Sequence, residues 1–198
     1  MEYMRTIPDK YFDLCIADPP YGINAAKMNM GNTKHKPIAN RQWTKKGWDT
    51  TIPHDDVFRE MLRVAKHAII WGGNYFPLPP TNAWIVWDKG YDGRLSFSDG
   101  EMAWTNMPIN MRIHRIIRQN TLDYDAIRIH PTQKPVALYA WLLDNYMIGG
   151  GVRFLTRSSG VGHRVSQRTR KDLTSTAASW MMTTTRRRRN AFCVSATA

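Results

Sequence analysis

The sequence predicts an α/β domain, because short apolar runs alternate with a helical pattern along its first 150 residues. Apolar runs at 12–17, 68–71 and 83–88 are continuous rather than alternating, and turn residues follow them. Strands of this composition are typical of a sheet that is covered on both faces. The length of 198 residues suits one domain with its own core.

The order of the predicted elements supports this fold class. The strand FDLCIA (12–17) ends where two prolines stop any ladder, and residues 22–53 follow as a long loop. DDVFREMLRVAKH (55–67) has apolar residues at helical spacing and acidic residues at its start. Further strands are predicted at 101–104 and 111–117, and a second helix begins near Pro135 with Thr132 as its cap.

Positive charge is concentrated in the last quarter of the chain. Residues 151–198 hold ten of the 28 Lys and Arg residues and one acidic residue, so they carry +9 of the net charge of +12. They show no sustained period of 3.6 or 2, and 14 of these 48 residues are Ser or Thr. This composition predicts a disordered basic tail with a different origin from residues 1–150.

Composition also excludes several classes of protein. No apolar run approaches the roughly 20 residues that a membrane span needs, and the N-terminus has no apolar stretch of the secretory type. The two cysteines, Cys15 and Cys193, lie too far apart for a disulfide framework or a metal motif. We therefore expect a cytoplasmic protein with no membrane partner and no metal site.

Asp18-Pro19-Pro20-Tyr21, directly after the first strand, is the strongest signal of function. It resembles the catalytic motif of the DNA amino-methyltransferases in which this motif precedes the cofactor motif. The resemblance implies methyl transfer from S-adenosylmethionine to the exocyclic amine of adenine or, less often, cytosine. Asp18 and the Pro19 carbonyl would accept hydrogen bonds from that amine, with Pro19 and Pro20 keeping the backbone stiff. Tyr21 would stack on a target base flipped out of the duplex.

A second motif, His130-Pro131-Thr132-Gln133-Lys134-Pro135, resembles the segment that opens the helix before the cofactor motif in the same family. A helix start with a hydroxyl, an amide and a cation suits a carboxylate. Trp71-Gly72-Gly73-Asn74 and the run from Trp84 to Asp88 resemble the middle strands of the family more weakly. The resemblance covers residues 3–150 and implies cofactor contacts from His130, Thr132, Gln133 and Lys134.

Candidate DNA contacts lie in two places. Trp43, Lys45 and Lys46 lie in the long loop, where they either contact bases and phosphates or are simply solvated. Arg112 and Arg115 alternate with apolar residues in the stretch 112–129, where family members carry a target-recognition insert. Asp18 rather than Ser at the first motif position favours adenine. The implied partners are double-stranded DNA and a cognate restriction endonuclease.

The glycine-loop motif that should follow the second helix is missing. Family members continue with a strand ending in D-P-F-x-G-S-G, and Gly160 and Gly162 lie among Arg and Ser instead. Trp180, Met181 and Met182 have single codons, and with Thr183 they read Asp-Asp-Asp one base earlier. With suitable synonymous codons, the same frame gives G-T-I-L-D-P-F-F-G-S-G from Gly151 onward. We therefore hypothesise one inserted base near Gly149, from a slipping guanine tract, decay of a phage gene or a sequencing error.

The expected product is an incomplete Rossmann-like methyltransferase. Residues 1–150 form a partial catalytic region, and residues 151–198 form an out-of-frame tail, so the sheet lacks its cofactor-binding strands. The strands near 12–17 and 68–71 would expose apolar edges, giving low solubility and no methyl transfer. Two alternatives stay open: an amino-methyltransferase acting on cytosine, RNA or a protein glutamine, and a non-enzymatic basic nucleic-acid binder.

Overall fold

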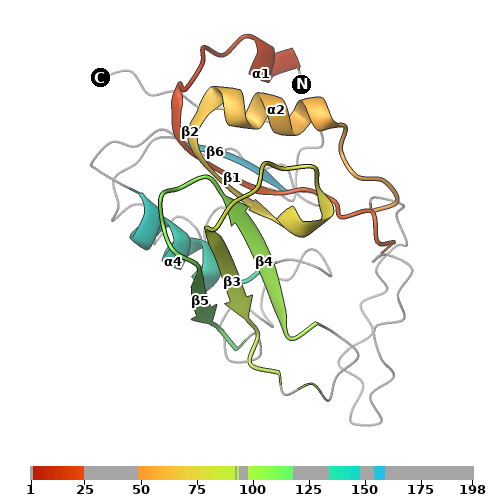
Figure 1. Ribbon diagram of the computed structural model, residues 1–198, viewed down its shortest axis with the longest axis vertical. Coiled ribbons are helices and arrows are strands. Elements are labelled where there is room, and N and C mark those ends of the chain that lie inside the picture. The colour runs from red at the N-terminus through yellow and green to blue at the C-terminus, as the bar shows by residue number, and fades with distance from the viewer. Residues whose placement is uncertain are drawn as a thin grey trace, which may run out of the picture.

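The computed structural model describes residues 2–24, 49–91, 93, 98–117, 134–147 and 154–158. Its strands form one mixed, open sheet in the order β5-β3-β4-β2-β1-β6 (Figure 1). The strands are β1 (Phe12–Asp18), β2 (Ala65–Trp71), β3 (Trp84–Asp88), β4 (Gly100–Thr105), β5 (Arg112–Arg115) and β6 (Phe154–Ser158). The helices are α1 (Glu2–Arg5), α2 (Asp55–Val64), the 3-10 turn η2 (Gly73–Tyr75) and α4 (Val136–Tyr146). The predicted α/β class is confirmed.

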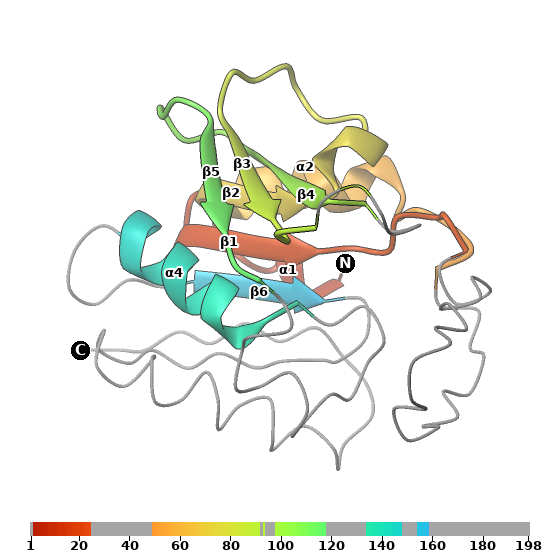
Figure 2. The same cartoon turned by 90° about the horizontal axis from the view of Figure 1, so that it is seen from below.

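Strand directions bring several strand ends to one edge of the sheet. β1 is parallel to both β2 and β6, and Figure 2 shows β1 and β6 side by side and pointing the same way. β4 is antiparallel to both β2 and β3, and β5 is parallel to β3. The carboxyl ends of β1, β2, β3 and β6 therefore lie at the same edge, and β4 begins there. In open α/β sheets this is the edge where ligands bind.

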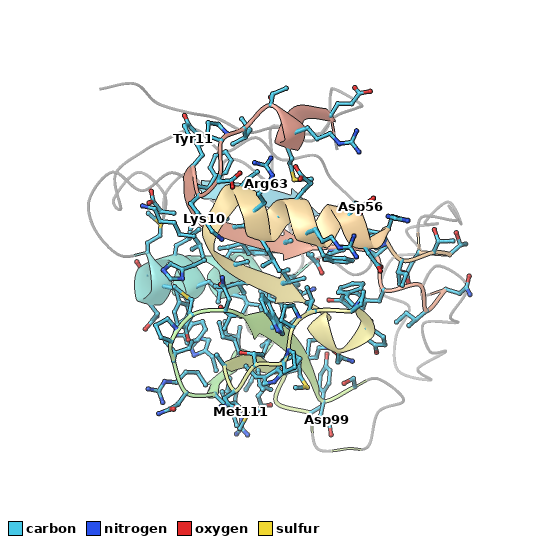
Figure 3. The ribbon with its side chains drawn as sticks, turned by 45° about the horizontal axis from the view of Figure 1, so that its top comes forward. Lys10, Tyr11, Asp56, Arg63, Asp99 and Met111 are labelled. Atoms are coloured by element: carbon cyan, nitrogen blue, oxygen red, sulfur yellow. The ribbon has the colours of Figure 1, made fainter. Side chains whose placement is uncertain are left out.

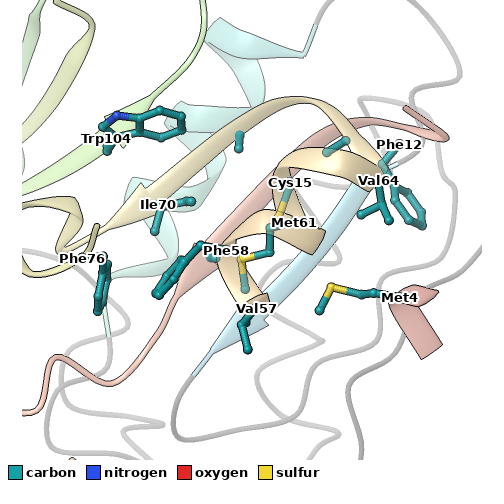
Figure 4. Close-up of a cluster of buried hydrophobic side chains, with 13 residues drawn as sticks. Met4, Phe12, Cys15, Val57, Phe58, Met61, Val64, Ile70, Phe76 and Trp104 are labelled. Carbon is teal, nitrogen blue, oxygen red and sulfur yellow. The ribbon is translucent and has the colours of Figure 1, made fainter. Parts of the chain in front are cut away.

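Helices cover both faces of the sheet, which explains why β1 is apolar at consecutive positions. Cys15 and Ala17 pack with Val57, Phe58 and Met61 of α2 in the cluster drawn in Figure 4. The opposite face packs Leu14 and Ile16 of β1 against Leu138 and Leu142 of α4. Burying a large apolar side chain in this way contributes about 1.5–3 kcal/mol. The interpretation of the apolar runs as doubly covered strands is therefore confirmed.

The helix predicted at 55–67 is shorter in the structure. α2 ends at Val64, and residues 65–67 begin β2, where Ala65 pairs with Phe12. The last turn of α2 is held from outside, because Lys10 Nζ donates to the carbonyls of Leu62 (2.6 Å) and Ala65 (3.1 Å). Figure 3 shows Lys10 and Arg63 at this end of α2. Pairing with β1 and capping by Lys10 override the helical spacing of the sequence.

β6 corrects the prediction that the sheet lacks a strand beyond β1. Its residues, FLTRS, belong to the segment predicted as a disordered tail, yet they pair in parallel with β1 from Leu14↔Phe154 to Asp18↔Ser158. β1 lies between β2 and β6, and β2 lies between β1 and β4. The predicted exposed edges at both strands are therefore wrong. A parallel ladder needs only backbone groups, so an apolar pattern is not required.

The remaining predictions about the fold concern α4, the long loop and membrane-spanning segments. α4 starts directly after Pro135, as its sequence predicts, but Pro135 itself is the N-cap, so the prediction that Thr132 caps this helix is wrong. Residues 25–48 of the long loop lie outside the described residues. In the part of the chain that the structure describes, no helix has the length and apolar character to cross a membrane.

Candidate active site

The candidate site forms where strand ends meet. Asp18 is the last residue of β1, and Tyr21 follows it in the chain. The antiparallel strand β4 brings Glu101 to this edge, opposite Trp87 of β3. Lys134 comes from a distant part of the sequence, and it lies just before Pro135, the N-cap of α4. The site therefore depends on the order of strands as much as on the motifs.

Lys134 joins the two sequence motifs directly. Its Nζ donates to Asp18 Oδ1 at 2.6 Å and to Tyr21 Oη at 3.0 Å, although 116 positions separate Lys134 from Asp18. Tyr21 Oη in turn donates to Asp18 Oδ1 at 3.0 Å. The carboxylate, the phenol and the ammonium thus form a closed hydrogen-bonded triangle. Its members come from the two motifs that the sequence singles out, 18–21 and 130–135.

Glu101 and Lys89 extend this triangle into a charge-balanced cluster. Glu101 Oε2 lies 3.1 Å from Lys134 Nζ, and Glu101 Oε1 lies 2.9 Å from Lys89 Nζ. The Lys134 side chain is 3% exposed and that of Asp18 is 11% exposed. Buried charges are tolerated only when they are paired, and here two ammonium groups match two carboxylates. Each charge of the cluster therefore depends on the others.

Burial and pairing shift the pKa values of the cluster. Burial raises the pKa of Asp18 above its ordinary value, with the Lys134 ammonium acting against that rise. Burial also raises the pKa of Tyr21, and the charges of Asp18 and Glu101 add to it. For Glu101, burial acts upward, but Lys134 and Lys89 outweigh it and lower the pKa to about 2. Burial acts to lower the pKa of Lys134, but Asp18 and Glu101 raise it above its ordinary value.

Aromatic packing fixes the ring of Tyr21. The ring stacks on Tyr75 with centroids 5.2 Å apart and planes 14° apart, and Phe76 meets it edge-on. Gly72, with φ +69°, passes so close that a Cβ at this position would lie 2.3 Å from the Tyr21 ring. Gly72 is thus required both for its positive φ and for the close approach. One face of the Tyr21 ring is taken by Tyr75.

The predicted site residues fall into three groups. Asp18, Pro19, Tyr21 and Lys134 come together, with Pro19 buried and Pro20 half-buried beside them. Arg112 and Arg115 lie on β5, which β3, β4 and β2 separate from β1. Arg115 pairs with Asp88 at 2.7 Å. The remaining predicted contacts lie outside the described residues: His130, Thr132, Gln133, Trp43, Lys45 and Lys46.

Sequence reasoning missed Glu101 and Lys89. Both carry a recognisable signal, since Glu101 is an acidic residue in the otherwise apolar strand EMAW and Lys89 follows directly after WIVWD. A charge at the carboxyl end of one strand or at the start of its antiparallel neighbour marks the edge where a site forms. The family motifs do not include either residue.

The side chains of the site are a carboxylate pair, two ammonium groups and a phenol, all of which donate or accept hydrogen bonds. Among the residues that the structure describes, no group of three His, Cys, Asp or Glu side chains is arranged to hold a metal ion.

Comparison with protein-family models finds no match for this chain, and neither does comparison with curated proteins.

Proposed function

We propose that residues 1–150 are the part of a DNA amino-methyltransferase that binds and orients the target amine. The reaction is transfer of a methyl group from S-adenosylmethionine to the exocyclic amine of adenine in double-stranded DNA. One observation carries the proposal: the Asp18 carboxylate and Lys134, from the two motifs that resemble this family, meet at 2.6 Å. Two segments this far apart in sequence have no local reason to meet.

The chemistry of the target explains the residue types. An exocyclic amine is a poor nucleophile because its lone pair is delocalised into the ring. A carboxylate and a backbone carbonyl that accept its two hydrogens draw the nitrogen towards sp³ geometry and aim the lone pair. Asp18 is buried, so its hydrogen bonds act with little screening by water. Removing such a preorganised acceptor costs about 10²–10³ in rate.

The described residues do not fit the cofactor half of the reaction. Lys134 is the predicted cofactor contact that the structure describes, and two carboxylates already match its charge. It therefore offers no unbalanced positive charge to the carboxylate of S-adenosylmethionine. The sequence also lacks the family's glycine loop after α4. We accordingly propose that this chain has lost methyl transfer while keeping its amine-receiving residues.

Calorimetric titration with S-adenosylmethionine tests the proposal. The chain as written is compared with a chain whose C-terminus is restored by the one-base correction. We expect heat of binding from the corrected chain alone. Binding by the chain as written would show that residues 151–198 supply a cofactor site, and binding by neither would remove the family assignment.

A second variant separates cofactor binding from amine chemistry. In the corrected chain, Asp18→Ala should still bind S-adenosylmethionine and should reduce methyl transfer to DNA by about 10²-fold or more. Transfer is measured with labelled cofactor on duplex DNA and on RNA in parallel. Equal transfer by the corrected chain and its Asp18→Ala variant would contradict the role given to Asp18.

A further inference from the structure

We infer that Glu101 is a positioning residue that sets how far the Lys134 ammonium covers the Asp18 carboxylate. The inference rests on the proposed function for its meaning and on the geometry of the cluster for its support. Glu101 lies on β4 and belongs to neither of the two sequence motifs.

The Lys134 ammonium competes with the target amine for one acceptor. Lys134 Nζ donates to Asp18 Oδ1 at 2.6 Å, the separation expected for a hydrogen bond from an amine to a carboxylate. Tyr21 Oη donates to the same oxygen. Both donors occupy Oδ1, and the Lys134 ammonium withdraws charge from the whole carboxylate, so Asp18 accepts a hydrogen bond from an incoming amine more strongly when Lys134 is drawn away. A residue that draws Lys134 away prepares Asp18 for substrate.

Glu101 is placed to draw Lys134 away. Its Oε2 lies 3.1 Å from Lys134 Nζ, within reach of the same ammonium that pairs with Asp18. The shorter distance to Asp18 indicates that the ammonium rests mainly on Asp18, with Glu101 as the second partner. A small movement of Nζ towards Glu101 shifts the pairing and leaves the Asp18 carboxylate with the Tyr21 hydroxyl as a donor.

Lys89 opposes this pull from the other side of Glu101. Glu101 Oε1 is paired with Lys89 Nζ at 2.9 Å, and the Lys89 side chain is 8% exposed. Lys89 thus holds Glu101 back from Lys134, and the chain of contacts runs from Lys89 through Glu101 and Lys134 to Asp18. Changes at its two ends should have opposite effects on Asp18.

Other groups face the same cluster and are held constant in the test. Tyr21 Oη also approaches Glu101 Oε2, at 3.4 Å, and the ring of Trp71 lies 5.2 Å from Lys134 Nζ. Tyr139 of α4 is half-buried nearby, and its pKa is raised by desolvation first and by the charge of Asp18 second. These three side chains remain in each variant, so a changed titration reports on the charged residues.

The test is an NMR titration of the Asp18 side-chain carboxyl in the chain as written, assigned with Asp18→Asn. In Glu101→Gln, Lys134 pairs with Asp18 alone and a repelling carboxylate is lost. The midpoint pH of the Asp18 titration therefore moves down. In Lys89→Met, Glu101 is released to Lys134 and draws it from Asp18, so the midpoint moves up. Opposite movements are the expected result.

Loosening of the site would give a different pattern. Exposure of Asp18 to water in both variants brings its raised pKa down in both, and that common direction overturns the inference. Glu60→Gln is the matched control, because Glu60 pairs with Arg63 on α2, away from the site, and leaves the Asp18 midpoint in place. Movement of the midpoint in this control as large as in Glu101→Gln also overturns it.

The two proposals fail separately. Opposite movements together with no cofactor binding by the corrected chain would keep the role of Glu101 and remove the methyltransferase assignment. A common movement together with methyl transfer by the corrected chain would keep the enzyme and remove the positioning role.

Discussion

At the scale of single residues, Lys134 is the side chain on which the candidate site depends most. It is the cation that pairs with both Asp18 and Glu101, and its side chain is 3% exposed. Lys134→Met removes this ammonium from the buried carboxylate of Asp18 and from the half-buried carboxylate of Glu101. We expect the free energy of unfolding to fall by about 3–5 kcal/mol, measured by urea denaturation at neutral pH. Lys66→Met, which breaks an exposed pair with Asp13, should cost about 1 kcal/mol or less.

The pH dependence of stability should carry the signature of Glu101. Its pKa in the folded chain is about 2, below its ordinary value of 4.5, because Lys134 and Lys89 outweigh the effect of burial. A lowered pKa contributes stability that is present above pH 4.5 and is lost as the pH falls towards 2. The gap between the native chain and Glu101→Gln should therefore close over that range. A gap that stays constant down to pH 2 would contradict the pairing. Asp18, whose pKa burial raises, acts with the opposite sign.

Gly72 sets the position of Tyr21. Gly72→Ala places a methyl group 2.3 Å from the Tyr21 ring at a residue with φ +69°. The positive φ alone costs about 1 kcal/mol, and the displaced ring adds to it. Thermal unfolding measures the loss, and Gly93→Ala is the control, since its φ is also positive but its nearest contact is 3.9 Å away. Equal losses at both positions would argue against the close packing of Tyr21.

At the scale of elements, the sequence predicts what is local and misses what is paired. The strands at 12–17, 68–71, 83–88 and 101–104 carry their own apolar pattern, so their existence follows from composition. The antiparallel direction of β4 and the contact of Glu101 with Lys134 do not, because both depend on which strands become neighbours. Asp18 and Lys134 were predictable as site residues through motif resemblance, whereas their direct contact was not.

β6 was missed for a related reason. Phe154–Ser158 has no pattern that favours a strand, and its pairing depends on the edge that β1 offers. The edge that β1 offers therefore decides that these residues form a strand more than their own sequence does. Because β6 covers an edge that would otherwise be exposed, the predicted low solubility is tested by removing this strand.

Shortening the chain tests what β6 contributes. A chain of residues 1–150 lacks β6 and leaves the backbone groups of β1 unpaired at one edge, whereas a chain of residues 1–158 retains the strand. We expect the shorter chain to unfold at lower denaturant and to aggregate more readily, as measured by urea denaturation and light scattering. Identical behaviour of the two chains would mean that β6 adds nothing to the sheet in solution.

At the scale of the whole molecule, much of the net charge lies in a segment outside the residues that the structure describes. Residues 159–198 contain eight Lys and Arg residues and one Asp, a net of +7. Such a segment should bind duplex DNA of any sequence. Its affinity should fall steeply as the salt concentration rises, because the release of counterions from the DNA on binding then gains less free energy. Filter binding across a salt series, for the full chain and for residues 1–158, measures this. A preference for one DNA sequence, or equal binding by the chain of residues 1–158, would place the DNA contacts in residues 1–158 instead.

The parallel pairing of β6 with β1 has a consequence for the test of the proposed function. β1 accepts a neighbour through its backbone, so the strand beside Asp18 can be exchanged without altering any side chain of the cluster. Under the proposed function, we expect that a separate polypeptide with the in-frame strand, glycine loop and following helix displaces β6 and complements the chain in trans, as the second half of a split protein does.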